Sequence, residues 1–128
     1  MSSVVLDASA VIALLRDETG SELIATYIGD AAISAVNLQE VVKALLLRGV
    51  NIEAARKMLD ALHLDVRAHD VEDAYDAAKL HEATMVHGSG LGDRTCMALA
   101  IKEKCPVITT DQAWAKLDID GLKVVLVR

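Results

Sequence analysis

Short apolar runs alternate with amphipathic stretches along most of the chain. Val4 to Leu6 is an apolar run that ends at an aspartate, and the apolar positions that follow recur at the three- and four-residue spacing of a helix. A similar change from run to helical spacing occurs near residues 107–117. Uninterrupted apolar runs are typical of parallel strands that are buried on both faces. The pattern therefore predicts an α/β fold, a three-layer α/β/α sandwich with a mostly parallel central sheet.

The clearest amphipathic helix is expected at residues 36–48. Leu38, Val41, Val42, Leu45 and Leu46 follow the spacing of one buried face, and a glycine ends the pattern. The other expected elements are helices at 22–28, 51–62, 70–86, 91–104 and 113–117, and strands at 4–6, 31–34, 64–66, 107–108 and 124–127.

The composition permits a substantial core that contains almost no aromatic residues. Hydrophobic residues make up 53% of the 128 residues, with no Phe, one Trp and two Tyr. The core must therefore be built from Val, Leu, Ile and Ala. Because we find no repeat, low-complexity tract or linker, we expect a single domain over residues 1–128.

Several features favour a cytoplasmic protein. Cys96 and Cys105 are too few for a disulfide framework, and we expect free thiols in a reducing compartment. Met1 to Ser3 lack the basic region of a signal peptide. Apolar runs are all shorter than the roughly 18 residues of a membrane span, so no membrane association is expected.

Four carboxylates stand where an α/β protein builds a site. Asp7 and Asp111 each follow an apolar strand, and ligands bind beyond the carboxyl ends of parallel strands. Asp93 begins a helix after a Gly-rich loop, and Glu40 lies in the first turns of another helix. Taken singly, each aspartate is also a favourable helix N-cap, and Glu40 is an ordinary solvated acid with Asn37 as a neighbour on the same helix face.

The surroundings of these acids favour a metal site over simple capping. Ser9 and Thr109 place hydroxyl groups beside Asp7 and Asp111, where they can orient a carboxylate. Converging carboxylates repel one another unless a cation lies between them, and Mg²⁺ or Mn²⁺ prefers such oxygen ligands. The four histidines lack zinc-type spacing with the two cysteines.

The net charge of −6 argues against a generic nucleic-acid binder, which usually has a basic excess. Any nucleic-acid chemistry must therefore depend on metal ions and on local basic residues. Arg94, next to Asp93, is a candidate for contact with a substrate phosphate, and equally a surface arginine paired with a nearby acid.

Four segments together resemble the PIN-domain family, and within it the VapC-like toxins of toxin–antitoxin pairs. They are Val5-Leu6-Asp7-Ala8-Ser9-Ala10, Ser34-Ala35-Val36-Asn37-Leu38-Gln39-Glu40, Leu91-Gly92-Asp93-Arg94 and Val107-Ile108-Thr109-Thr110-Asp111-Gln112-Ala113-Trp114. Each segment is weakly specific alone, but they occur in family order and spacing and span essentially the whole chain.

The resemblance implies a metal-dependent endoribonuclease. The family's acids fall on Asp7, Glu40, Asp93 and Asp111, which would bind Mg²⁺ or Mn²⁺ for hydrolysis of RNA by an activated water. The supporting positions fall on Ser9, Asn37 and Thr109. The resemblance also implies a homodimer that a VapB-like antitoxin neutralises.

Two other function classes remain to be weighed. A phosphoryl-accepting receiver domain is also small, acidic and α/β, but it has adjacent acids after its first strand and a late-strand lysine, which this chain lacks. A non-catalytic PIN-like module that only binds RNA or protein is the second alternative. Degenerate members of that kind lose pocket acids, whereas this chain keeps all four.

Overall fold

A five-stranded parallel sheet lies at the centre of the computed structural model, which describes residues 2–128. The strands are β1 (Val4–Leu6), β2 (Ala31–Ser34), β3 (Asp65–Arg67), β4 (Val107–Thr109) and β5 (Val124–Leu126). Their order in the sheet is β3-β2-β1-β4-β5, and every neighbouring pair is parallel. The predicted parallel α/β architecture is therefore confirmed.

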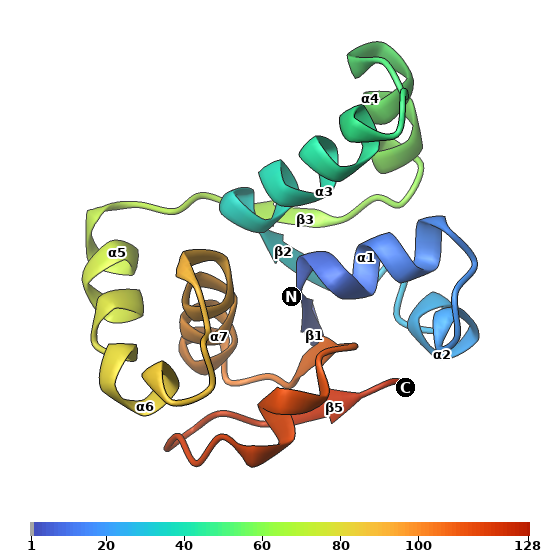
Figure 1. Ribbon diagram of the computed structural model, residues 1–128. Helices are drawn as coiled ribbons and strands as arrows, with labels where there is room; N and C mark the ends of the chain where they lie inside the picture. The colour runs from blue at the N-terminus through green and yellow to red at the C-terminus, as the bar shows by residue number, and fades with distance from the viewer. Residues whose placement is uncertain (1) are drawn as a thin grey trace.

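Helices lie on both sides of this sheet (Figure 1). They are α1 (Ala8–Leu15), α2 (Ser21–Ala25), α3 (Ala35–Leu47), α4 (Ile52–Asp60), α5 (Val71–Ala78), α6 (His81–Met85) and α7 (Leu91–Glu103), with a 3₁₀ helix η1 (Gln112–Lys116) after β4. Among the described residues, we find no helix with the length and apolar character needed to cross a bilayer.

Two cores, one on each face of the sheet, follow from the alternation of side chains along β1. Val4 and Leu6 pack in one core with residues of α1, α3 and α4. Val5 points to the other face and packs in a second core with residues of α7 and with Trp114 of η1. Two cores separated by one sheet make the predicted three-layer sandwich.

The single helix expected at residues 70–86 is wrong, because the chain forms α5 and α6 with a bend at Lys79 and Leu80. Leu80 turns inward and packs against the second core. Thr84, which is buried, donates its hydroxyl to the carbonyl oxygen of Leu80 at 2.7 Å and so joins the new helix to the bend. The helix expected at 22–28 is also shorter, since α2 ends at Ala25.

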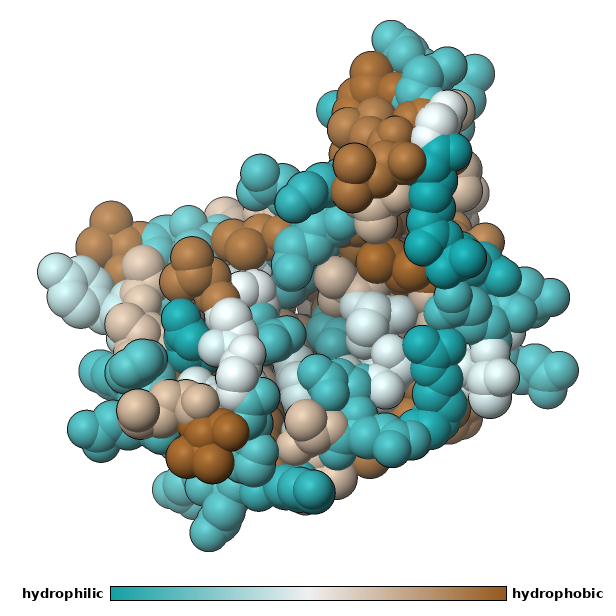
Figure 2. Space-filling view, in the orientation of Figure 1, coloured by the Kyte–Doolittle hydropathy of each residue, from teal (hydrophilic) through white to brown (hydrophobic). Residues whose placement is uncertain are grey.

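The hydrophobic spacing at residues 36–48 predicted a wider buried face than α3 has. Leu45 is buried as expected, but Leu46 is 45% exposed. Leu47 and Ile52 are also exposed, at the junction of α3 and α4. Figure 2 shows hydrophobic side chains gathered over α4 and the adjoining end of α3. The extra aliphatic residues therefore form a surface instead of enlarging the core.

The topology explains why the candidate acids meet. β1 and β4 are hydrogen-bonded neighbours, with Val5 beside Val107 and Leu6 beside Ile108. Because they run parallel, their carboxyl ends share one edge of the sheet. Asp7 follows β1 at this edge. Thr109 is the last residue of β4, and Asp111 comes two residues after it.

Candidate active site

Asp7 is a buried carboxylate that three groups hold in one orientation. Its Oδ1 accepts hydrogen bonds from the Ser9 hydroxyl at 2.7 Å and from the Ala10 backbone N–H at 2.8 Å. Its Oδ2 accepts the Thr109 hydroxyl at 2.6 Å. Asp7 is only 5% exposed. Asp7 therefore caps α1, as expected for an aspartate that precedes a helix, but it is also hydrogen-bonded to β4.

Burial raises the pKa of Asp7 from 3.8 to about 6. Hydrogen bonds from Thr109 and Ser9 act in the opposite direction but do not outweigh the burial, and the charge of Asp93 raises the pKa further. A buried carboxylate is costly to ionise because it loses its hydration. A cation beside Asp7 would lower this cost, so the environment suits a metal ligand.

Hydroxyl groups link the ends of β1 and β4 in a small network. The Thr109 hydroxyl, which is fully buried, accepts the backbone N–H of Asp111 at 3.0 Å. The Ser9 hydroxyl accepts the backbone N–H of Thr110 at 3.1 Å. Asp111 is exposed, and its Oδ1 accepts the Ala113 N–H at 3.0 Å to cap η1. Ser9 and Thr109 thus both contact the Asp7 carboxylate, and their supporting role in a metal site stays a prediction.

Asp93 lies in the first turn of α7 and is half-buried. Its Oδ2 accepts the backbone N–H of Gly90 at 3.2 Å, so Asp93 also has a capping role. Burial is the main cause that raises the pKa of Asp93, and the negative charge of Asp111 adds to it, while Arg94 acts against it. The charge of Asp111 therefore raises the pKa of Asp93, and the charge of Asp93 raises the pKa of Asp7.

Asn37 joins the α3 part of the site to α7. Its Nδ2 donates to Glu40 Oε1 at 2.7 Å and to the carbonyl oxygen of Gly92 at 2.9 Å. Asn37 is buried, whereas Glu40 itself is exposed. Asn37 is therefore more than a neighbour on the same helix face, because it also fixes the position of Glu40 relative to the Asp93 turn.

Acids from three elements lie near enough to the buried Cys96 to influence the pKa of its thiol. Burial is the largest cause that raises the pKa of its thiol, followed by the negative charges of Asp7, Asp93 and Glu40. These acids come from the end of β1, from α7 and from α3. The sequence predicted Cys96 only as a core residue, which it is, and the influence of the acids on its thiol was not foreseen.

Arg94, next to Asp93, is hydrogen-bonded to a backbone carbonyl group. Its Nη1 donates to the carbonyl oxygen of Ser89 at 2.8 Å. With His69 and His81, Arg94 lines a hollow of about 490 Å³ between α5 and α7. A contact with substrate phosphate stays a prediction.

The acid group fits a hard divalent cation in its chemistry, although it is not a closed metal cage. Within residues 2–128, no three His, Cys, Asp or Glu side chains lie close enough together to ligate one ion directly. Mg²⁺ usually takes one or two protein carboxylates and keeps several waters, so such a cage is not required. The buried Asn37 Oδ1 finds no hydrogen-bond donor within the described chain. The carboxylates of the four candidate acids offer only hard oxygen atoms as metal ligands.

Gly92 was not foreseen as part of the site, although the sequence contains a signal for it. Glycine is unfavourable inside a helix, yet Gly92 is the second residue of α7. The structure shows that the Glu40 carboxylate lies against its Cα, where any side chain would stand.

The overall fold is shared with solved structures of low sequence identity. A toxin–antitoxin complex from Klebsiella pneumoniae contains a chain with a TM-score of 0.73 and 18% identity, and the match covers 94% of this chain and 95% of that one. VapBC2 from Rickettsia felis, bound to a DNA fragment from its promoter, gives 0.71 and 16%, covering 96% and 97%. VapBC-5 from Mycobacterium tuberculosis gives 0.63 and 24%, covering 98% and 99%.

A search of curated proteins found no match. The family model described as PIN domain, in contrast, matches residues 4–120, which includes all four candidate acids and nearly the whole described fold. This chain therefore belongs to the PIN domain family.

Proposed function

We propose that this protein is a Mg²⁺- or Mn²⁺-dependent endoribonuclease that acts as the toxin of a toxin–antitoxin pair. The observation that carries the proposal is the contact between separate elements that bear the four acids: Asp7 is hydrogen-bonded to Thr109, two residues before Asp111, and the Glu40 carboxylate lies against Gly92, next to Asp93. These are the four acids of the family pattern, and they reach one edge of the sheet from separate parts of the chain. Burial disfavours the ionised forms of Asp7 and Asp93, and a bound cation would offset that cost.

The roles follow from burial and exposure. Asp7 and Asp93, which are buried and half-buried, would hold the ion, while the exposed Glu40 and Asp111 would complete the site directly or through water. When bound, the ion supplies the positive charge that activates a water molecule and offsets charge on the phosphodiester. Ser9 and Thr109 keep the Asp7 carboxylate in a fixed orientation.

The direct test is cleavage of a mixed RNA pool by the purified protein with Mn²⁺, Mg²⁺ or EDTA. Asp93→Asn should lower the metal-dependent rate by more than ~100-fold, the equivalent of about 3 kcal/mol in activation free energy. Asp70→Asn is the matched control, since Asp70 also caps a helix but is exposed on α5. Metal-independent cleavage, or full activity of Asp93→Asn, would refute the proposal, and no cleavage by any form would favour a binding module.

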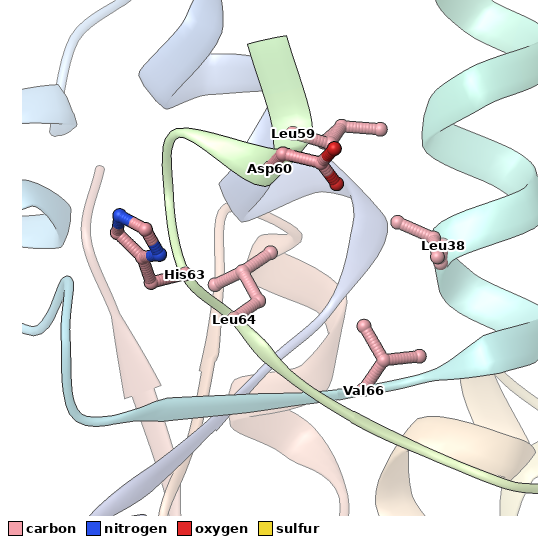
Figure 3. Close-up of a pocket in the computed structure, with 6 residues that line it drawn as sticks. All are labelled: Leu38, Leu59, Asp60, His63, Leu64 and Val66. Atoms are coloured by element: carbon pink, nitrogen blue, oxygen red, sulfur yellow. The ribbon is translucent and has the colours of Figure 1, made fainter. Parts of the chain in front are cut away.

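A groove beside α3 and α4 is a suitable place for a VapB-like antitoxin. The residues that line a hollow of about 360 Å³ here are Leu38, Leu59, Asp60, His63, Leu64 and Val66. Their side chains are drawn in Figure 3. A second hollow of about 100 Å³ continues the first past Val42 and Ile52. Similar structures include toxin–antitoxin complexes, and apolar grooves of this kind accept the apolar face of a partner helix.

The antitoxin proposal is tested by affinity purification of the tagged protein from its native host, where a short polypeptide partner should copurify. Ile52→Glu places a charge in the groove at a position that is 50% exposed, so the fold should tolerate it. We expect this variant to lose copurification with the partner while it retains RNA cleavage. Equal recovery of the partner with the variant would exclude the groove.

We also propose a homodimer in the cytoplasm. Val71, Tyr75 and Leu91 expose apolar surface on α5 and at the start of α7, which supports self-association. Both cysteines are free thiols, which suits a reducing compartment. Light scattering at micromolar concentration should give twice the 13.7 kDa chain mass, and a single-chain mass would refute the dimer.

A further inference from the structure

The carboxylate of Glu40 occupies the space that a side chain at position 92 would need. A Cβ built on Gly92 would lie 2.6 Å from Glu40 Cδ and 2.7 Å from Glu40 Oε2. These separations are far shorter than van der Waals contact between such atoms. A methyl group at position 92 and the present position of Glu40 therefore exclude one another.

Backbone conformation does not explain this glycine. The described glycines with positive φ are at positions 20, 29, 49, 88 and 121, and Gly92 is not one of them. Since Gly92 lies within the first turn of α7, alanine would be the more stable residue there. Position 92 therefore carries a residue that destabilises its own helix, and the Glu40 carboxylate occupies the space where a side chain would lie.

Asn37 holds the same carboxylate from the other side. Its Nδ2 donates to Glu40 Oε1 and to the carbonyl oxygen of Gly92, so one buried amide joins both residues. Both partners are acceptors, which fixes the orientation of the amide group. The Glu40 carboxylate is thus held by a hydrogen bond from Asn37, and it fits against α7 because Gly92 has no side chain.

We propose that Gly92 and Asn37 are positioning residues that place the Glu40 carboxylate against α7, beside Asp93, so that it can serve the metal site. The inference rests on the proposed metal-dependent function, but it concerns how this chain arranges its own acid. Gly92 acts by leaving space, and Asn37 acts by a hydrogen bond. A substitution at either position should therefore act only through Glu40.

A double-mutant cycle read by Mn²⁺ binding tests this dependence without any measurement of activity. We expect Gly92→Ala to weaken Mn²⁺ binding by ~10-fold, as is typical for residues that orient metal ligands. Glu40→Ala should weaken it by at least as much. In the Glu40→Ala background, Gly92→Ala should have no further effect, because no carboxylate remains to be displaced.

Two further variants separate positioning from a general structural role. Asn37→Ala should weaken Mn²⁺ binding when Glu40 is present and have no effect in the Glu40→Ala background. Gln39→Ala, which removes an exposed neighbour on α3, should bind Mn²⁺ like the wild type. The metal-free Gly92→Ala protein should unfold at the same or a higher urea concentration than the wild type.

Three results would overturn the inference. They are unchanged Mn²⁺ binding by Gly92→Ala, additive losses in the double variant, or a Gly92→Ala protein that does not fold. If the wild type itself neither binds Mn²⁺ nor cleaves RNA, the proposed function fails instead. A crystal structure of metal-free Gly92→Ala then decides the positioning claim, which requires that the Glu40 carboxylate has left its present place.

Discussion

The buried Asp7 carboxylate should make the metal-free protein less stable as the pH rises. Its pKa is raised from 3.8 to about 6, a difference of roughly 2 units, which at 1.36 kcal/mol per unit is about 3 kcal/mol. Because the folded-state pKa is above the unfolded one, the stabilising contribution is complete below about pH 4. It is lost as the pH rises through about 6. Asp7 is only 5% exposed, so solvent screening reduces this figure little.

Asp7→Asn tests this conclusion, because asparagine has nearly the same shape and no charge at any pH. Its oxygen can still accept from Ser9 and Ala10, but the bond from the Thr109 hydroxyl is lost or reversed, at a cost of about 1 kcal/mol. At pH 8 the variant should therefore be more stable than the wild type by about 2 kcal/mol. At pH 4 it should be equal or slightly less stable.

The assay is urea unfolding in EDTA from pH 4 to pH 8, followed by circular dichroism and by the fluorescence of the single tryptophan, Trp114. Asp70→Asn is the matched control: it replaces an exposed capping aspartate of α5 and should change stability by less than about 0.5 kcal/mol. The reasoning is refuted if Asp7→Asn is no more stable than the wild type at pH 8. It is equally refuted if the difference does not change between pH 4 and pH 8.

Three further predictions concern the same region. Thr109→Val should destabilise the protein by about 1–3 kcal/mol in urea unfolding, because it removes the hydroxyl that binds Asp7, whereas Thr109→Ser should retain most of the stability. Trp114→Phe should cost less than about 1.5 kcal/mol by circular dichroism, since it also removes a buried indole N–H that finds no acceptor within the described chain. A thiol reagent should modify the half-buried Cys105 well before Cys96, whose pKa is strongly raised by burial and by the surrounding acids, and equal rates would contradict the described burial.

The sequence predicted the sheet well because its strands carry a strong local signal. Val4 to Leu6 and Val107 to Thr109 are short apolar runs next to helical spacing, and each is followed closely by an aspartate. Parallel strands place such aspartates at one edge, so the approach of Asp7 to the Asp111 segment followed from topology alone. The family pattern then added Glu40 and Asp93, which no local rule would have grouped with them.

Features that depend on packing were not predictable from spacing. The bend between α5 and α6 lies in a stretch with neither glycine nor proline, and at this bend Leu80 packs against the second core. Leu46 fits the periodic face of α3 but lies beyond the reach of the core. The relation between Gly92 and Glu40 joins residues 52 positions apart, and no pattern along one helix can reveal such a contact.

The central place of β1 in the sheet has a consequence for synthesis on the ribosome. Asp7 is synthesised well before its hydrogen-bonding partner Thr109, which lies 102 residues later. Contacts of such long range form late, because the intervening chain must first be ordered. A nascent polypeptide therefore cannot assemble the acid group until β4 has left the exit tunnel, and products of interrupted translation that end before β4 would carry no complete site.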